Sequence, residues 1–420
     1  MTAPPDAPVA QLRRQLGVFD AVVIGLGSMI GAGIFAALGP AAAAAGSGLL
    51  PALALAAVVA YCNATSSARL AARYPASGGT YVYGRQRLGD FWGYLAGWGF
   101  VVGKTASCAA MALTAGTYLW PAQAHAVAVT VVVALTAVNY VGLQKAAWLT
   151  RAIVAIVLAV LAFVVTACLT STGSHLGQVT GGHHTTPLDV LQAAGLLFFA
   201  FAGYARIATL GEEVRDPART IPRAIPLALA ITLIVYAAVA VAVLALLGSH
   251  LATATAPLVD AIRAAGLPGF APAVRVGAAI AALGSLLALI LGVSRTTLAM
   301  ARDRHLPHAL SAVHPRFRVP HRAELTVGAI VAIVAATTDL RGAIGFSSFG
   351  VLAYYAIANA SAWTLTRAEG RPPRVVPILG LAGCVALAVA LPVSATISGA
   401  AVLAAGAAIY ALRRAISRTP

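Results

Sequence analysis

Lys104 is the residue of this 420-residue chain whose position most requires a chemical explanation. It lies near the middle of the apolar stretch 91–118, within WGFVVGKTASCAAM. An ammonium group is costly at that depth, and a lysine stem of about 6 Å cannot reach water about 15 Å away. Two roles follow: Lys104 pairs with a carboxylate of a bound solute, or it is reversibly protonated, because burial favours the neutral amine. A purely structural charge is the alternative.

Two apolar blocks contain glycines where a plain membrane-spanning helix would avoid them. GLGSMIGAGIF at 25–35 contains four glycines, and FFAFAGYAR at 198–206 has Gly203 between aromatic residues. Each glycine weakens a helix by about 1 kcal/mol relative to alanine, and backbone groups released from a helix need other partners in lipid. Close packing of helices through small residues would also explain the pattern. If the helices open instead, the released N–H groups can bind an anion and the released carbonyls a cation.

The composition shows what kind of element must position these residues. Hydrophobic residues make up 60% of the chain and charged residues 10%, with a mean hydropathy of +0.88, whereas about a quarter of the residues of a soluble domain are charged. The apolar residues come in blocks of about 20, the length that a helix needs to cross about 30 Å of hydrocarbon. An all-α polytopic membrane protein surrounded by membrane lipid is therefore expected. About twelve transmembrane helices are predicted, at residues 18–45, 48–71, 91–118, 122–141, 150–171, 188–211, 223–248, 271–300, 324–339, 343–366, 375–392 and 394–412.

The net charge of +16 does not indicate nucleic-acid binding. Arg and Lys cluster in alternate connections between the apolar blocks and not on one basic face. This pattern predicts a multi-pass protein of the plasma membrane with both termini cytoplasmic, and the start of the chain has no signal-peptide pattern. The cysteines all lie inside apolar blocks, where they are expected to be reduced and buried: Cys62, Cys108, Cys168 and Cys384.

Four motifs resemble the amino acid, polyamine and organocation (APC) transporter superfamily, in particular its bacterial amino acid permeases. They are GLGSMIGAGIF at 25–35, YPASGGTYVYG at 74–84, FFAFAGYARIATLGEEVRDPARTIPRAI at 198–225 and, more weakly, SRTTLAMARDRHLP at 294–307. Their order and spacing fit the superfamily over most of residues 18–325. The combination is specific for the family and says little about the solute.

The resemblance implies a five-plus-five inverted repeat in which helices 1 and 6 are discontinuous, followed by two C-terminal accessory helices. Matching interruptions in two halves are a sequence sign of a transporter site. The implied organisation is a cytoplasmic N-terminal segment 1–17, a first repeat 18–171 with helices 1–5, an extracellular loop 172–187, a second repeat 188–366 with helices 6–10, accessory helices 11 and 12 at 375–412, and a cytoplasmic tail 413–420.

The resemblance also implies where an amino acid binds. Its carboxylate meets N–H groups of the opened stretch of helix 1, and its ammonium meets released carbonyls of Met29, Phe199 and Ala202. Phe199 falls where the family often has an aromatic side chain that covers the solute, although core packing would explain it as well. The predicted substrate-binding residues are Met29, Ile30, Gly31, Ala32, Gly33, Lys104, Cys108, Phe199, Ala202, Gly203 and Ala205, and the predicted coupling or gating residues are Lys104, Phe199 and Arg206.

The sequence departs from the family pattern in ways that bear on the solute. Many relatives that carry cations have an acidic residue where this chain has Ala205, which Arg206 follows. No Asp or Glu is expected deep in any span, so a cationic solute would lack a counter-charge. A neutral or acidic amino acid is therefore preferred. Val157 replaces a proton-coupling lysine that some relatives have on helix 5, which makes Lys104 the candidate for that role. Arg206 is expected to line the inner exit or to pair with lipid phosphate or Glu212.

The expected function is secondary active transport of an amino acid by alternating access, with a proton as candidate coupling ion. The alternative is a permease or channel for another small amine or carboxylate. An enzyme is not expected, because GLGSMIG lies in a spanning block without the strand and helix of a dinucleotide site. No cofactor or metal is expected, and the oligomeric state is not predicted. Two segments are expected to be loops: the segment with His175, His183 and His184, and the proline-containing stretch 212–223.

Overall fold

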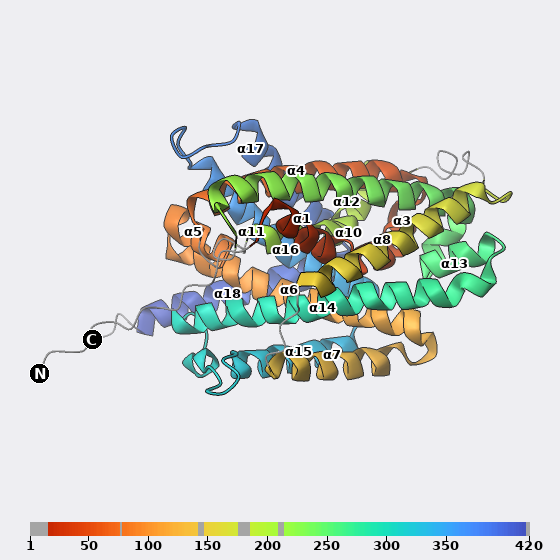
Figure 1. Cartoon of the computed structure of the whole chain (residues 1–420). Helices are drawn as coiled ribbons and strands as arrows, with labels where there is room; N and C mark the ends of the chain where they lie inside the picture. Colours follow the sequence, from red (N-terminus) through yellow and green to blue (C-terminus); the bar gives the residue numbers. More distant parts are fainter. Residues whose placement is uncertain (1–15, 76–77, 142–146, 175–184, 209–213, 417–420) are drawn as a thin grey trace, which may run out of the picture.

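The computed structural model describes residues 16–75, 78–141, 147–174, 185–208 and 214–416, and within them the regular elements are all helical. Figure 1 shows long helices lying side by side in one bundle. The short helix α5 and the last turns of α18 lie at one end of the bundle, and α13 lies at the other. We call these the α5 end and the α13 end. Residues 1–15 and 417–420, Glu212, and the loop with His175, His183 and His184 lie outside the described residues.

Most helices have the length of a membrane crossing and follow the apolar blocks of the sequence. The first half contains α1 (Val18–Met29), α2 (Ala32–Ala36), α3 (Leu38–Ala45), α4 (Leu49–Arg73), α5 (Thr80–Leu88), α6 (Asp90–Leu119), α7 (Ala124–Tyr140) and α8 (Ala147–Thr170). The second half contains α10 (Pro187–Phe201), α11 (Ala205–Ala208), α12 (Pro217–Leu247), α13 (Pro257–Ala264), α14 (Ala271–Arg302), α15 (His321–Thr337), α16 (Leu340–Trp363), α17 (Val375–Ala390) and α18 (Val393–Ile416). Short 3-10 turns join several of them: η1 (Gly46–Gly48), η2 (Pro121–Gln123), η3 (Ala202–Tyr204), η4 (Gly248–Thr253), η5 (Pro268–Phe270) and η6 (His308–Ser311).

Nine helices or helical runs in the described part of the chain are long and apolar enough to cross a membrane, and α17 is a shorter apolar helix. The predicted all-α polytopic membrane fold is therefore confirmed. The helices α6 and α15 fall outside that set: α6 is long enough but less apolar, with Lys104 near its middle, and α15 has only 17 residues. The twelve-span count, the inverted repeat and the domain boundaries stay predictions.

The two glycine-containing blocks are interrupted helices. Helix α1 ends at Met29 and α2 begins at Ala32, because the backbone leaves helical geometry at Ile30 (ψ 31°) and Gly31 (ψ −132°). Helix α10 ends at Phe201 and continues through the turn η3 into α11. The interruptions lie against each other.

Gly203 allows this close approach. A Cβ atom added to Gly203 would lie 2.7 Å from the backbone nitrogen of Met29, closer than side chains pack, and still closer to Ser28. The sixth block therefore needs glycine at this position for the two backbones to touch.

Side chains from neighbouring helices occupy carbonyls that the interruptions release. The Tyr236 hydroxyl on α12 lies 2.5 Å from the carbonyl oxygen of Met29 and 3.0 Å from that of Ala200, so one hydroxyl proton serves two acceptors. On α14, the Ser285 hydroxyl donates to the carbonyl of Gly27 at 2.9 Å. In lipid such partners replace the missing helical hydrogen bonds.

The prediction of a loop over 212–223 is wrong for its second part. Helix α12 begins at Pro217, and Asp216 is its N-cap residue. The helix continues through Pro222 and Pro226. Proline is favoured at the first position of a helix, where its missing N–H leaves no bond unmade. The seventh span therefore begins six residues earlier than the predicted start at 223.

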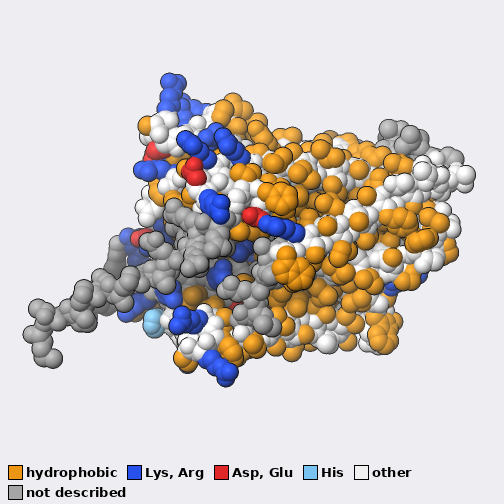
Figure 2. All heavy atoms as spheres, in the orientation of Figure 1, with side chains coloured by type: hydrophobic (Ala, Val, Ile, Leu, Met, Phe, Trp, Pro, Cys, Tyr) orange, Lys and Arg blue, Asp and Glu red, His pale blue; other side chains and the backbone are white. Residues whose placement is uncertain are grey.

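The surface divides into an apolar wall and a charged end. Figure 2 shows Lys and Arg gathered at the α5 end, whereas hydrophobic side chains cover the long side of the bundle. Large hydrophobic residues exposed at the surface of the described part include Ile234, Val389 and Val393, which are 70%, 69% and 72% exposed. Such a surface suits hydrocarbon and not water.

A salt-bridge network ties the α5 end together. The Arg87 guanidinium on α5 donates to both carboxylate oxygens of Glu369 at 3.0 and 2.8 Å, and also to the side chain and carbonyl of Thr364. Glu369 and Thr364 belong to the connection between α16 and α17. Arg73, at the end of α4, contributes a longer contact of 3.5 Å to the same carboxylate.

Candidate solute-binding site

A cavity of about 120 Å³ lies where the interrupted helices meet α6 and α14. It extends from Met111 and Ser107 in the middle of α6 to Gly78 and Ala299, which lie toward the α5 end. The remaining lining residues are Ser28 of α1; Phe100 and Lys104 of α6; Phe199, Ala202, Gly203 and Arg206 of the interrupted sixth block; and Ser285, Ala288, Leu289, Gly292, Arg295 and Thr296 of α14.

The cavity brings together five of the residues predicted from the sequence. They come from two segments that are about 100 residues apart in the chain: Lys104 from α6, and Phe199, Ala202, Gly203 and Arg206 from the interrupted helix formed by α10, η3 and α11.

The other predicted residues lie beside the cavity and do not line it. Met29, Ile30, Ala32 and two glycines are buried at the interruption of the first block and in the first turn of α2. The Met29 carbonyl already accepts a hydrogen bond from Tyr236. Cys108 is fully buried one turn beyond Lys104 on α6. Ala205 is the first residue of α11. The two glycines are Gly31 and Gly33.

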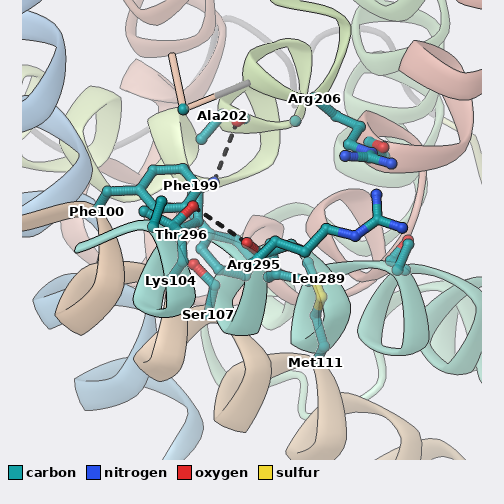
Figure 3. Close-up of a pocket in the computed structure, with 17 residues that line it drawn as sticks. Phe100, Lys104, Ser107, Met111, Phe199, Ala202, Arg206, Leu289, Arg295 and Thr296 are labelled. Carbon is teal, nitrogen blue, oxygen red and sulfur yellow. Dashed lines mark hydrogen bonds between the residues drawn. The ribbon is translucent and has the colours of Figure 1, made fainter. Parts of the chain in front are cut away.

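Lys104 makes a hydrogen bond between an ammonium group and a backbone carbonyl inside the cavity. Its ammonium donates a hydrogen bond to the carbonyl oxygen of Ala202 at 3.2 Å, as Figure 3 shows, and the side chain is 6% exposed. Tyr355 on α16 donates to the same carbonyl at 3.3 Å. Because η3 interrupts the helix here, the Ala202 carbonyl can accept both donors. It therefore accepts the ammonium of Lys104, and its role toward the ammonium of a solute stays a prediction.

The walls of the cavity are mainly apolar. Phe100 and Phe199 flank Lys104 in Figure 3, and Met111 and Leu289 lie farther from Ala202. Phe100 is held by Tyr354, whose ring centre is 5.1 Å away. Polar positions are few: Ser107 shares a hydrogen bond with Ser347 at 2.5 Å, and Thr296 donates to the Gly292 carbonyl at 3.2 Å. An apolar pocket with a few polar groups is typical of small-molecule sites.

Positive charge dominates the half of the cavity toward the α5 end. Arg206 and Arg295 project from opposite sides toward the same region in Figure 3. With Lys104 they make three cationic side chains, and no Asp or Glu is among the described residues that line the cavity.

Sequence reasoning missed Arg295 and Ser285. Arg295 lies within the motif at 294–307 and near the end of the predicted span 271–300, where an arginine gives no sign of facing a cavity. Ser285 gave no signal, because a serine in an apolar block is common. No group of three His, Cys, Asp or Glu residues in the described ranges could hold a metal ion.

The sequence analysis also overlooked a buried acid. It expected no Asp or Glu deep in a span, yet Glu324 in the first turn of α15 is fully buried. The predicted span 324–339 began at this residue, so the sequence placed Glu324 at a helix end and gave no sign that it is buried. Packing of α15 against α7, α6 and α14 covers it instead.

Comparisons with known proteins agree with this arrangement. The family described as amino acid permease matches residues 20–369. A protein named as an uncharacterized transporter from Mycobacterium tuberculosis is 74% identical over 416 residues, which are 99% of this chain and 94% of the relative. The branched-chain amino acid permease BcaP of Bacillus subtilis is 26% identical over 90% of this chain and 88% of its own length. Human cationic amino acid transporter 4 is 27% identical over 86% of this chain and 61% of its own length.

The family match covers most of the chain, including both interrupted helices and all the elements that line the cavity. The superfamily resemblance of the motifs is thereby confirmed. This chain belongs to the amino acid permease family, and it is a membrane transporter and not an enzyme.

Proposed function

We propose that this protein is a secondary active transporter that moves a neutral or acidic amino acid across the plasma membrane by alternating access, with a proton as coupling ion. The observation that carries the proposal is the hydrogen bond from the Lys104 ammonium to the Ala202 carbonyl, inside a cavity bounded by both interrupted helices. An acceptor that binds a lysine ammonium also suits the ammonium of an amino acid.

In this proposal the solute exchanges places with Lys104. The solute ammonium takes the Ala202 carbonyl, and the displaced Lys104 ammonium pairs with the solute carboxylate. The predicted backbone donors at Gly31, Ala32 and Gly33 do not line the cavity in this conformation, and the proposal makes them partners of the carboxylate in another state of the transport cycle. Charge-assisted hydrogen bonds replace one another in this exchange, so a zwitterion can bind without leaving a buried ion unpaired.

The choice between solute classes rests on the charges of the cavity. Relatives at 26% and 27% identity are named for branched-chain and for cationic amino acids, so their names do not decide the class for this chain. A cationic side chain would lie near the Lys104 ammonium, and this chain has Ala205 where many relatives that carry cations have an acidic residue. Because an unpaired charge in a membrane interior costs several kcal/mol, neutral or acidic side chains are favoured.

The proposed orientation places the α5 end and both termini in the cytoplasm. Arginines concentrate at that end, in agreement with the positive-inside rule. The cavity extends toward the same end, so the solute would exchange with the cytoplasm in this conformation.

The test is counterflow in liposomes that contain the purified protein. Vesicles loaded with unlabelled amino acid should accumulate labelled amino acid transiently, and competition by a panel at two pH values should identify the class. Competition by neutral or acidic amino acids supports the proposal. Competition only by arginine, lysine or polyamines contradicts the argument from cavity charge. Flux that does not saturate and shows no counterflow identifies a channel instead.

A further inference from the structure

A second hollow opens at the surface of the bundle between α15 and α18, and we call it the α15–α18 groove. Its volume is about 600 Å³, against about 120 Å³ for the solute cavity. Exposed residues of α15 and α18 form its rim, among them Thr326, Ile330 and Ser398, and buried residues of α6 and α14 form its floor, among them Ala106 and Thr297. The groove and the solute cavity share no described lining residue, so the groove is a separate site.

The wall of the groove suits hydrocarbon. The hydroxyls of Thr105, Thr338 and Ser398 donate to carbonyls one turn earlier in the chain, so these polar groups already have partners within the protein. Aliphatic and aromatic side chains, among them Trp98 and Phe346, make up most of the remaining wall, and no charged residue is among the described residues that line it. A polar solute would lose its hydration there and gain few hydrogen bonds in return.

The dimensions of the groove distinguish between apolar occupants. From Thr326 to Thr338 the groove follows α15 for about 18 Å, at 1.5 Å per residue. One leaflet of hydrocarbon is about 15 Å deep, so a single acyl chain that enters from one end of the bundle can lie along the groove. A helix about 10 Å wide would need about 1,400 Å³ over the same length, which is more than the groove holds.

Arg322 borders the groove at the α5 end. Leu306 and Leu310 line the groove there, in the connection between α14 and α15, which Figure 1 shows at this end of the bundle. Arg322 lies one turn before the lining residue Thr326 on α15, and it is exposed. Its guanidinium donates to the carbonyl of Ala309, the neighbour of Leu310, at 3.5 Å.

Arg413 borders the same end of the groove from α18. Its guanidinium donates at 3.0 Å to the carbonyl of Arg304, which lies two residues before the lining residue Leu306. Tyr410, one turn earlier on α18, packs against the same buried cluster around Tyr94 as Leu306 does. Arginines of α15, of α18 and of the connection before α15 therefore meet where the groove ends.

Neighbouring acids do not neutralise these arginines. In the described part of the chain, no salt bridge involves Arg304, Arg322 or Arg413. Asp303, which precedes Arg304, is paired with Arg85 at 2.6 Å. A guanidinium has five N–H donors and binds phosphate oxygens well, so one bond to a carbonyl leaves donors for a phosphate.

We propose that the α15–α18 groove binds one anionic phospholipid of the leaflet at the α5 end. An acyl chain lies in the groove, and the phosphate lies at Arg322 and Arg413. At the α13 end, Asp339 and Arg341 flank the lining residues, and their opposite charges offset each other, so the headgroup belongs at the α5 end. Arginines next to a membrane span attract anionic headgroups. The inference does not depend on which solute the protein transports or on how transport is coupled.

The experiment counts bound lipids by native mass spectrometry. Purified, delipidated protein in detergent is mixed with phosphatidylglycerol or with phosphatidylcholine of the same acyl chains. One phosphatidylglycerol should be retained. Phosphatidylcholine should bind about 30-fold more weakly, the combined effect of two arginines near an anionic group.

Two kinds of variant test the two parts of the site. Thr326→Trp fills the groove at an exposed position and should weaken phosphatidylglycerol binding about tenfold. Leu325→Trp is its control, because this exposed neighbour does not line the groove. Arg322→Gln and Arg413→Gln should each weaken binding about fivefold, whereas Arg367→Gln, at an exposed arginine between α16 and α17, should not.

Each other outcome contradicts the inference. Equal binding of the two lipids would remove the role of the arginines, and wild-type binding by Thr326→Trp would remove the role of the groove. Equal losses in Leu325→Trp or Arg367→Gln would show binding to the general surface. A protein dimer that Thr326→Trp disrupts while lipid binding is unchanged would assign the groove to a second copy of the chain. None of these results bears on amino acid counterflow, which tests the proposed function separately.

A second measurement uses the wild type and does not depend on whether a variant folds. Phosphatidylglycerol with a photoactivatable group in its acyl chain is cross-linked to the protein, and peptide mass spectrometry identifies the modified residues. Cross-links should concentrate on Thr326, Ile330 and Ser398, and unlabelled phosphatidylglycerol should suppress them more than phosphatidylcholine does. Cross-links of equal yield on Ile234 and Val389, which are exposed on α12 and α17, would overturn the inference.

Discussion

At the scale of single residues, Lys104 takes the place that the ammonium of an amino acid would need. Its hydrogen bond to the Ala202 carbonyl satisfies a buried cation in the solute-free protein. Binding then becomes an exchange of one ammonium for another, and the net gain comes from the new pair between Lys104 and the solute carboxylate. Hydrogen bonds to charged groups contribute about 1.5–3 kcal/mol each.

We therefore expect Lys104→Ala to weaken solute binding about 10- to 100-fold, the equivalent of that energy. The pH dependence of binding that Lys104 contributes should also decrease. Competition in counterflow, measured over a range of pH, checks both expectations. Thr105→Val is the control, because Thr105 is a buried neighbour that bonds only to the Val101 carbonyl of its own helix and does not line the cavity. Unchanged affinity together with unchanged pH dependence in Lys104→Ala would rule out both proposed roles.

At the scale of elements, the site depends on two interrupted helices that touch. Gly203 in η3 packs directly on the backbone of the first block, within 2.7 Å of the Met29 nitrogen for an added Cβ. The contact is between two backbones, and neither can yield by changing a rotamer.

Gly203→Ala should therefore destabilise the protein by about 1–3 kcal/mol, the usual cost of overpacking, and reduce transport more than its effect on stability alone would. The melting temperature in detergent and the counterflow rate of folded protein are the measurements. Gly269→Ala serves as the control, because nothing lies within 4 Å of an added Cβ there. A variant with wild-type stability and transport would show that the two interruptions are not in contact.

The connection between α16 and α17 is held to α5 by Glu369 and Arg87. Hydrogen bonds from Arg87 lower the pKa of Glu369 from its ordinary 4.5 to about 2. Because the folded state has the lower pKa, this stabilisation is present above the ordinary value and is lost as pH falls toward the folded pKa. Glu369→Gln should therefore lower the melting temperature at neutral pH, and the difference from wild type should narrow below about pH 4.5. A difference that stays constant as the pH falls would argue against the ionised pair.

The sequence predicted what depends on local pattern and missed what depends on tertiary contact. The interruptions near Gly31 and Gly203 were predicted because glycine weakens a helix locally, and Lys104 because an ion in an apolar block is unusual in itself. Arg295 and Glu324 were missed, because an arginine or glutamate near a helix end is ordinary until the neighbouring helices show whether it faces water, a cavity or packed side chains. Pro217 was interpreted as a helix break. A proline is compatible with the first position of a helix, but the sequence alone did not show that α12 begins there.

At the scale of the whole molecule, the charge distribution predicts how the bundle sits in the membrane. All four cysteines are buried, so the natural protein should react little with a membrane-impermeant maleimide. Thr253→Cys at the end of η4 and Ala309→Cys in η6 place single exposed thiols toward the α13 end and the α5 end. In intact cells only Thr253→Cys should be labelled, and permeabilisation should expose Ala309→Cys as well. The reverse pattern would invert the proposed orientation.

The shared hydrogen bond of Tyr236 has a consequence for leakage. One phenolic hydroxyl lies between a carbonyl of each interrupted helix, so any separation of the two helices breaks at least one of its hydrogen bonds. We therefore expect the two interrupted helices to move together. If they moved separately, the cavity could open to both sides of the membrane at once, and solute would leak without coupling. Removing the hydroxyl in Tyr236→Phe should loosen this concerted motion and raise efflux into solute-free buffer relative to exchange. The low rate of uncoupled efflux would then depend on a single hydroxyl proton shared between two backbone carbonyls.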